Sequence, residues 1–145
     1  MIRAHNFFGV VTKVFDKKGI ELPLAPRPNT NAQDRYEKGS NIQYKYFGED
    51  IIDTMKETRH EGQKHFDDFL EGYCFGDFYT RDGLNDQQRE LLTFTFIATI
   101  GGCENQLMAH TQANLNVGND TATLVSPITL LLPSIAFPRS LTALP

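Results

Sequence analysis

The sequence has little that would tie it to a secreted, membrane or nucleic-acid-binding class. Its 145 residues include two cysteines, Cys74 and Cys103, which are too few for a disulfide framework, so we expect a cytoplasmic protein. The 14 Lys and Arg residues are outnumbered by 18 Asp and Glu residues and form no basic patch, which argues against a nucleic acid partner. The longest apolar run, residues 128–132, is far below the roughly 18–20 residues of a membrane span, so no membrane partner is expected.

Ligand-binding motifs are missing as well. The sequence contains no zinc or calcium motif and no glycine-rich phosphate loop, so we expect neither a metal nor another cofactor. What the chain does have is an ordinary globular composition, with 40% hydrophobic and 22% charged residues. This predicts one domain with enough apolar residues for a core.

Residues 1–29 differ in composition from the rest. Residues 7–15 are rich in β-branched and aromatic side chains, residues 16–19 look like a turn, and residues 20–24 can form a return strand. Pro23, Pro26 and Pro28 then suppress helix formation. We predict a short β-hairpin or extended arm followed by a linker over residues 1–29, with a poorly ordered tail as the alternative.

Residues 30–145 show helical patterns, and we expect an all-α domain. Predicted helices cover about residues 30–47, 49–57, 62–74, 86–100, 103–116 and 121–136, with an aromatic packed loop or short helical turn over residues 75–84. Pro127 and Pro133 fall inside the last helix, where each removes a backbone donor, so we expect a kink or break there.

The best site candidate lies in a predicted helical hairpin over residues 86–118, which turns at Gly101 and Gly102. Its first helix is apolar on most faces and should therefore be buried. Its second helix places Cys103, Gln106 and His110 at spacings of three and four, along one helical face. The site would therefore offer a thiol, an amide and an imidazole together.

Each candidate side chain also has a structural interpretation. His110 can transfer protons near neutral pH, or it can simply satisfy a buried hydrogen bond. Cys103 at a helix N-terminus can be a reactive thiol or a small buried residue. Glu90 on so apolar a helix should have either a raised pKa or a partner, which could be Arg89 or another cation. Arg81, Arg89 and Arg139 can clamp a carboxylate substrate or form surface pairs.

The chain resembles the carboxymuconolactone decarboxylase family over about residues 34–144, in segments that follow the family's order: CFGDFYTRDGL, RELLTFTFIATIGGCENQLMAH, NLNVGN and FPRSLTAL. The resemblance implies an all-helical, alkylhydroperoxidase-like fold with a central helical hairpin. It also implies a homo-oligomer, either a trimer or a hexamer.

The family has two chemical branches. In the decarboxylase branch, a lactone from aromatic-acid breakdown loses carbon dioxide without an organic cofactor. In the alkylhydroperoxidase branch, a CxxC pair before a motif histidine reduces peroxides, and a glutamate near the position of Glu90 assists a proton relay. Matched to that motif, Cys103 takes the first cysteine position and His110 the histidine position, but Gln106 replaces the second cysteine. The chain therefore lacks the vicinal dithiol and is closer to the decarboxylase branch.

From this resemblance we expect a decarboxylase-like enzyme that acts on a small carboxylated lactone or related acid. His110 would transfer the proton with Glu90 and Cys103 as further catalytic candidates, while Gln106 and an arginine, Arg81 or Arg89, would hold substrate oxygens. One alternative is a single-cysteine peroxidase using Cys103, whose thiolate would become a sulfenic acid. The other is a non-catalytic oligomer that binds a small acid.

Overall fold

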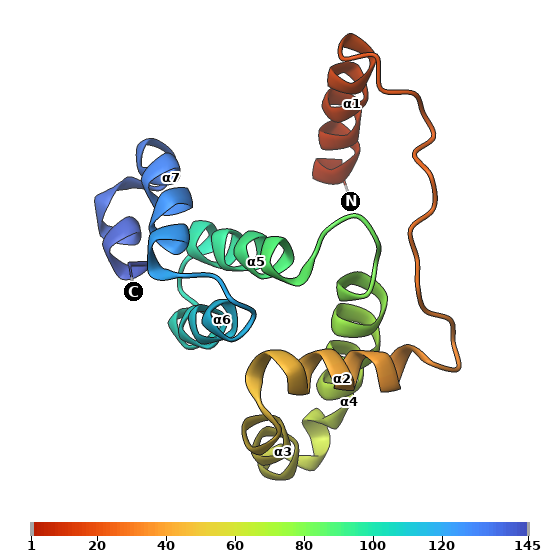
Figure 1. Ribbon diagram of the computed structural model, residues 1–145, viewed down its shortest axis with the longest axis vertical. Helices are drawn as coiled ribbons and strands as arrows, with labels where there is room; N and C mark the ends of the chain where they lie inside the picture. Colours follow the sequence, from red (N-terminus) through yellow and green to blue (C-terminus); the bar gives the residue numbers. More distant parts are fainter. Residues whose placement is uncertain (1, 145) are drawn as a thin grey trace.

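The computed structural model describes the backbone of residues 2–144 and the side chains of residues 7–144 (Figure 1). Within that range every regular element is a helix, which confirms the all-α prediction. In chain order the elements are α1 (Ile2–Lys17), α2 (Arg35–Phe47), α3 (Glu49–Thr58), the 3-10 turn η1 (Glu61–Gln63), α4 (Lys64–Asp68), the π-helix η2 (Phe69–Tyr79), α5 (Asp86–Ile100), α6 (Glu104–Asn116) and α7 (Thr121–Thr142).

The N-terminal segment is helical, so the predicted β-hairpin is wrong. The expected first strand, residues 7–15, lies inside α1, and the expected return strand, residues 20–24, is irregular. The prediction followed β-branched and aromatic composition, but Phe7, Val11, Val14 and Phe15 recur at a helical spacing that places them on one side of a helix. The extended part of the prediction corresponds to the irregular linker over residues 18–34.

Two glycines bring the backbones of α2 and η2 into direct contact. A Cβ on Gly39 of α2 would lie 1.8 Å from the carbonyl oxygen of Glu71, and a Cβ on Gly76 of η2 would lie 2.4 Å from that of Arg35. Neither position can hold a side chain without moving a helix. This close packing buries one of the two core clusters, which contains Tyr46, Phe75, Tyr79 and Ala113.

The helix that we predicted to end near residue 74 continues to Tyr79. In the sequence, Gly72 and Gly76 look like helix breakers and the aromatic residues after them follow no α-helical period. In the structure this stretch has π geometry, whose wider turn changes the period, and both glycines are buried. The expected packed loop is therefore shortened to residues 80–85.

Helices α5 and α6 form the predicted central hairpin, which turns at Gly101 and Gly102, both at positive φ. The start of α5 is fixed by a capping box in which Asn85 Oδ1 accepts from Gln88 N (2.9 Å) and Gln88 Oε1 accepts from Asn85 N (3.1 Å). The second core cluster lies between α5, α6 and the last helix and contains Phe94, Ala98, Leu107, Leu124, Ile128 and Ala143.

Helix α5 is buried on one face only. Leu92, Phe96 and Ile100 on its other faces are exposed to solvent in the single chain. A helix that is apolar on most faces normally has neighbours on all of them. The exposed faces of α5 are therefore candidates for contact with another molecule.

Helix α7 breaks at Ala136, whose φ of 62° and ψ of 165° are non-helical. We expected the break at Pro127 or Pro133, but it falls between Pro133 and Pro138, and both earlier prolines lie within the helix. The length and composition of α7 would allow it to cross a membrane, but core helices of soluble proteins meet the same two criteria. The break leaves residues 121–135 as the longest continuous part, which is shorter than the roughly 20 residues of a span.

Candidate functional site

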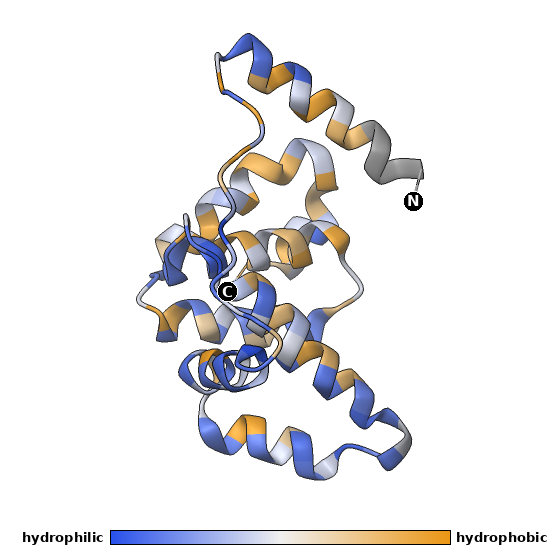
Figure 2. Ribbon diagram, turned by 90° about the vertical axis from the view of Figure 1, so that its right-hand side faces the viewer, coloured by the Kyte–Doolittle hydropathy of each residue, from blue (hydrophilic) through white to orange (hydrophobic). Residues whose placement is uncertain are grey.

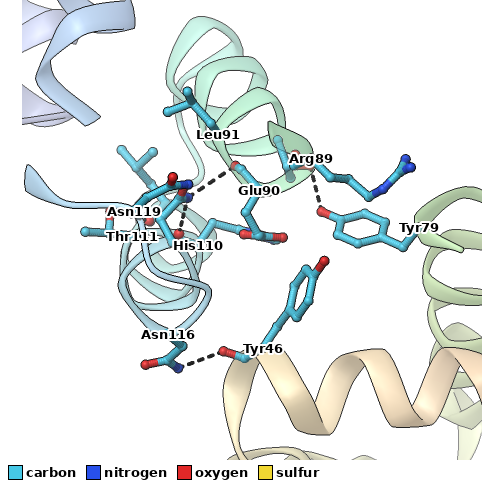
Figure 3. A network of polar contacts seen from close by, with 12 residues as sticks. Tyr46, Tyr79, Arg89, Glu90, Leu91, His110, Thr111, Asn116 and Asn119 are labelled. Atoms are coloured by element: carbon cyan, nitrogen blue, oxygen red, sulfur yellow. Dashed lines mark hydrogen bonds and ion pairs between the residues drawn. The ribbon is translucent and has the colours of Figure 1, made fainter. Parts of the chain in front are cut away.

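A buried carboxylate–imidazole pair joins α5 to α6. Glu90 Oε2 lies 2.8 Å from His110 Nδ1, and the side chains of Glu90 and His110 are 0% and 14% exposed (Figure 3). The structure thus brings together two of the predicted catalytic candidates from positions 20 residues apart. It also shows that the partner of Glu90 is His110 rather than Arg89.

The pair is held in place through the backbone of both helices. The buried Asn114 side chain donates from Nδ2 to the carbonyl oxygens of His110 (2.7 Å) and Glu90 (3.2 Å). Asn119 Nδ2 in turn donates to Asn114 Oδ1 at 2.8 Å. Our sequence reasoning missed Asn114; its position four residues after His110, on the same face of α6, was the available signal.

Two tyrosines from neighbouring helices point toward the Glu90 carboxylate. Figure 3 shows the Tyr46 side chain, from α2, and the Tyr79 side chain, from η2, approaching it from the side opposite α6. Burial, with the nearby carboxylates of Asp86 and Glu90, raises the pKa of the Tyr46 phenol, and burial together with Glu90 raises that of Tyr79. Both phenols therefore stay neutral and can act as hydrogen-bond donors.

The tyrosine hydroxyls differ in their hydrogen bonds. Tyr79 Oη lies 2.6 Å from Thr93 Oγ1. By contrast, Tyr46 Oη, Glu90 Oε1 and Gln43 Oε1 are buried without a hydrogen-bond partner among the described residues. Because buried polar atoms are rarely left unpaired, this polar cluster has the chemistry to hold a small hydrogen-bonding molecule such as water.

His110 is also fixed from a second side. The Phe47 ring meets the His110 ring edge-on, with 5.2 Å between ring centroids and an interplanar angle of 88°. With Nδ1 committed to Glu90, Nε2 is the ring nitrogen left for a reactant. Gln106, one turn earlier on α6, is exposed, so it lies outside the buried contacts of the pair.

Cys103 lies in a different place from His110. It lines a cavity of about 250 Å³ where α5, α6 and the C-terminal turn meet, together with Gly101, Arg139 and Thr142. Its Sγ lies 3.6 Å from the Ile97 carbonyl oxygen. Seven residues separate Cys103 from His110, about 10 Å along a helix axis, so the imidazole is not placed to activate the thiol directly.

The other cysteine belongs to the first core cluster. Cys74 packs against the cluster that holds Tyr46 and Tyr79. Both cysteines are free thiols, and no bond joins Cys74 to Cys103. Burial, reinforced by the Glu90 carboxylate, raises the pKa of the Cys74 thiol, which makes this thiol less reactive.

The predicted arginine clamps do not touch the Glu90–His110 pair. Arg89 donates from Nη1 to the Phe78 carbonyl oxygen (2.9 Å) and from Nη2 to that of Arg81 (2.5 Å), so it fastens the loop after η2. The Arg81 side chain is exposed on that loop. Within residues 7–144, neither guanidinium hydrogen-bonds to Glu90 or His110.

The arrangement has the parts needed for proton transfer. A carboxylate that accepts from Nδ1–H fixes the tautomer and orientation of the imidazole and stabilises the imidazolium once Nε2 takes a proton. Across the part of the chain that the structure describes, no three His, Cys, Asp or Glu side chains group as a metal site would require. The chemistry available from these residues is acid–base chemistry at His110.

Comparison with known proteins gives the same family as the sequence segments. The model of the carboxymuconolactone decarboxylase family matches residues 64–145, more than half of the chain. The chain is also 26% identical over 88 residues to 4-carboxymuconolactone decarboxylase of Acinetobacter baylyi (strain ATCC 33305 / BD413 / ADP1). That match takes in 61% of this chain and 65% of the relative, so the chain spans less than two thirds of that enzyme's length. This protein belongs to the carboxymuconolactone decarboxylase family.

Proposed function

We propose that this protein is a decarboxylase-like enzyme that acts on a small carboxylated lactone or a related acid by proton transfer, without an organic cofactor. The proposal rests mainly on the buried Glu90–His110 pair. In this pair Nδ1 of the imidazole lies 2.8 Å from Glu90 Oε2, and Nε2 is the nitrogen that would react with the substrate. The name of the Acinetobacter relative supports the same reaction class.

In the proposed reaction, the bond between the substrate's carboxylate carbon and its neighbour breaks and carbon dioxide leaves. The electron pair remains on the conjugated lactone, and the Nε2–H of protonated His110 gives its proton to carbon. Glu90 holds the imidazole in the orientation needed for transfer. Water then returns a proton to Nε2. Each turnover therefore uses one proton and needs no electron donor.

The substrate would approach the exposed edge of His110. Gln106, one turn away on α6, is exposed and could bind a substrate oxygen there, and Arg81 is the free guanidinium among the predicted clamps.

We place the protein in the cytoplasm. We further propose a homotrimer or homohexamer, because Phe96, Ile100 and other large apolar side chains lie exposed on the single chain. A second subunit would then shield the site from water.

The main alternative is a single-cysteine peroxidase based on Cys103. It is favoured by one observation, the cavity in which Cys103 and Arg139 lie together. Its thiolate would attack one oxygen of the O–O bond and become a sulfenic acid, while the other oxygen leaves as an alcohol or water. An external thiol would then have to reduce the sulfenic acid. The missing second cysteine and the distance to His110 make this the weaker proposal. Binding of a small acid without turnover is the remaining alternative.

Turnover of 4-carboxymuconolactone, measured as loss of lactone and release of carbon dioxide, tests the proposal. Wild type should be active, His110→Asn should be nearly inactive, and Cys103→Ser should keep most of its activity. Thiol-dependent peroxide reduction that Cys103→Ser abolishes, with no lactone turnover, would favour the peroxidase. Binding of the lactone acid without either reaction would favour the non-catalytic oligomer.

A further inference from the structure

Helix α1 carries an apolar face that the other described residues leave largely uncovered. Phe7, Phe8, Val11, Val14 and Phe15 share one side of the helix, and Phe7 and Phe8 are 65% and 64% exposed. In Figures 1 and 2 the helix projects from the rest of the molecule. Such an amphipathic helix is marginal in water by itself and needs a surface to pack on.

The charge of this segment is opposite to that of the rest of the chain. Residues 1–22 contain four Lys and Arg residues, including Lys13, Lys17 and Lys18, against two acidic residues. The whole chain has a formal net charge of −4, so the remainder is clearly acidic. An acidic surface is therefore the electrostatically favoured partner for α1.

A second uncovered apolar surface lies in a segment of the chain that has a net negative charge. Residues 49–79 contain nine acidic residues against three Lys and Arg residues. On α4 and η2 the same segment exposes Phe66 (59%), Phe69 (65%), Tyr73 and Phe78, with the last two rings 4.9 Å apart. We call these four aromatic residues the α4–η2 face. Its aromatic side chains and acidic surroundings are complementary to the valines, phenylalanines and lysines of α1.

In the structure α1 does not pack on the α4–η2 face of its own chain (Figure 1). The Arg27 carbonyl oxygen accepts from Asp82 N (3.1 Å), and Asn29 Nδ2 donates to the Thr80 carbonyl oxygen (3.0 Å), so the linker is pinned to the loop after η2. Only residues 18–26 remain unpinned, which span at most about 30 Å. Figure 1 places α1 and the α3–α4 region at opposite ends of the molecule's longest axis.

We propose that α1 of one copy docks by its apolar face on the α4–η2 face of a second copy. Each chain would then give its arm to one neighbour and receive an arm from another or from the same neighbour. The contact covers two apolar surfaces that are exposed in the single chain and pairs a basic segment with an acidic one. The inference goes beyond the proposed reaction and does not depend on it.

Photo-crosslinking between isotopically distinct copies tests the proposal on the full chain. Unlabelled protein with p-benzoylphenylalanine in place of Phe8 is mixed with heavy-isotope-labelled wild type, irradiated, digested and analysed by mass spectrometry. Crosslinks from the unlabelled α1 peptide to labelled peptides of residues 64–79 are expected. Crosslinks within one chain only, or to other parts of the protein, would overturn the proposal.

Variants on the two faces sharpen the result. Phe69→Ser, and separately the pair Lys13→Glu with Lys17→Glu, should each lower the yield of the inter-copy crosslink about tenfold, as expected for central interface residues. Leu130→Ser is the control, because Leu130 is also apolar and exposed (82%, against 65% for Phe69) but lies on α7. Equal loss with all variants would refute the assignment. So would flotation of the wild type with anionic vesicles without any crosslink between copies, since α1 would then bind lipid.

Discussion

Removing the His110 imidazole should destabilise the protein strongly, whatever the reaction proves to be. Glu90 is fully buried, its Oε2 has His110 Nδ1 as its partner, and its Oε1 has none in the structure. His110→Ala would therefore leave a carboxylate buried without a compensating group. Breaking a buried pair in this way typically costs about 3–5 kcal/mol.

That loss is large compared with the stability of a domain of this size. A single domain is stable by about 5–15 kcal/mol in total, so His110→Ala would remove about a fifth or more of it. At an unfolding entropy of about 2.1 cal/mol/K per residue, the change lowers the melting temperature by about 10–16 °C. His110→Asn should cost only about 1–2 kcal/mol, because the amide nitrogen occupies the place of Nδ1 and can still donate to Glu90.

Thermal melting and urea unfolding at one protein concentration, together with lactone turnover, separate the two roles of His110. We expect His110→Asn to be nearly as stable as wild type but about 100- to 10,000-fold slower, because an amide cannot transfer the proton. The double variant Glu90→Leu, His110→Leu should recover most of the stability that His110→Ala loses. If His110→Ala melts within about 2 °C of wild type, the buried pair is not the strong contact that we describe.

Three further predictions concern titrating groups. Burial would raise the pKa of Asp86, but the ion pair with Lys45 holds this pKa below its ordinary value. The stabilising effect of Asp86 is therefore present above about pH 4 and lost as pH falls through the lowered pKa. Urea unfolding of Asp86→Asn should therefore show a smaller loss of stability between neutral and acid pH than wild type, and an equal loss would contradict this. Because the pKa of Tyr46 is raised in the folded protein, its neutral phenol stabilises the fold below about pH 10. The absorbance of the Tyr46 phenolate should therefore appear only as the protein unfolds at higher pH. Tyr46→Phe should remove this contribution to the absorbance change. Iodoacetamide at neutral pH should modify the partly exposed Cys103 before Cys74, whose thiol pKa is raised by burial; peptide mapping that finds Cys74 modified first would argue against this packing.

Local patterns in the sequence predicted the central hairpin well. Three short-range signals define this hairpin: the apolar period of α5, the cap at Asn85 and the paired glycines at residues 101 and 102. The structure has both helices and the turn at these positions. The contacts that define the site are long-range. The spacing of Glu90 and His110 does not reveal that they face each other across two helices, and nothing near Tyr46 in the sequence indicates its approach to Glu90.

The failures of the sequence reasoning also have physical causes. In α1, β-propensity was given more weight than helical spacing, although the segment has no neighbouring strand to pair with. In η2, two glycines that allow close helix packing were interpreted as a helix end. The role of Gln106 stays a prediction: the face of α6 that meets α5 runs through Leu107 and Asn114, and Gln106 is exposed one turn before His110.

The π-helix η2 makes the site sensitive to the length of the chain as well as to its side chains. A π turn is one residue longer than an α turn, so deleting a single residue between Phe69 and Tyr79 would allow ordinary α-helical hydrogen bonding. The following residues would then rotate by about 100° around the axis. Tyr79 would leave its place near Glu90, and the loop that Arg89 fastens would shift with it. A relative lacking that residue could keep every other side chain of the site and still have a different polar cluster around its glutamate.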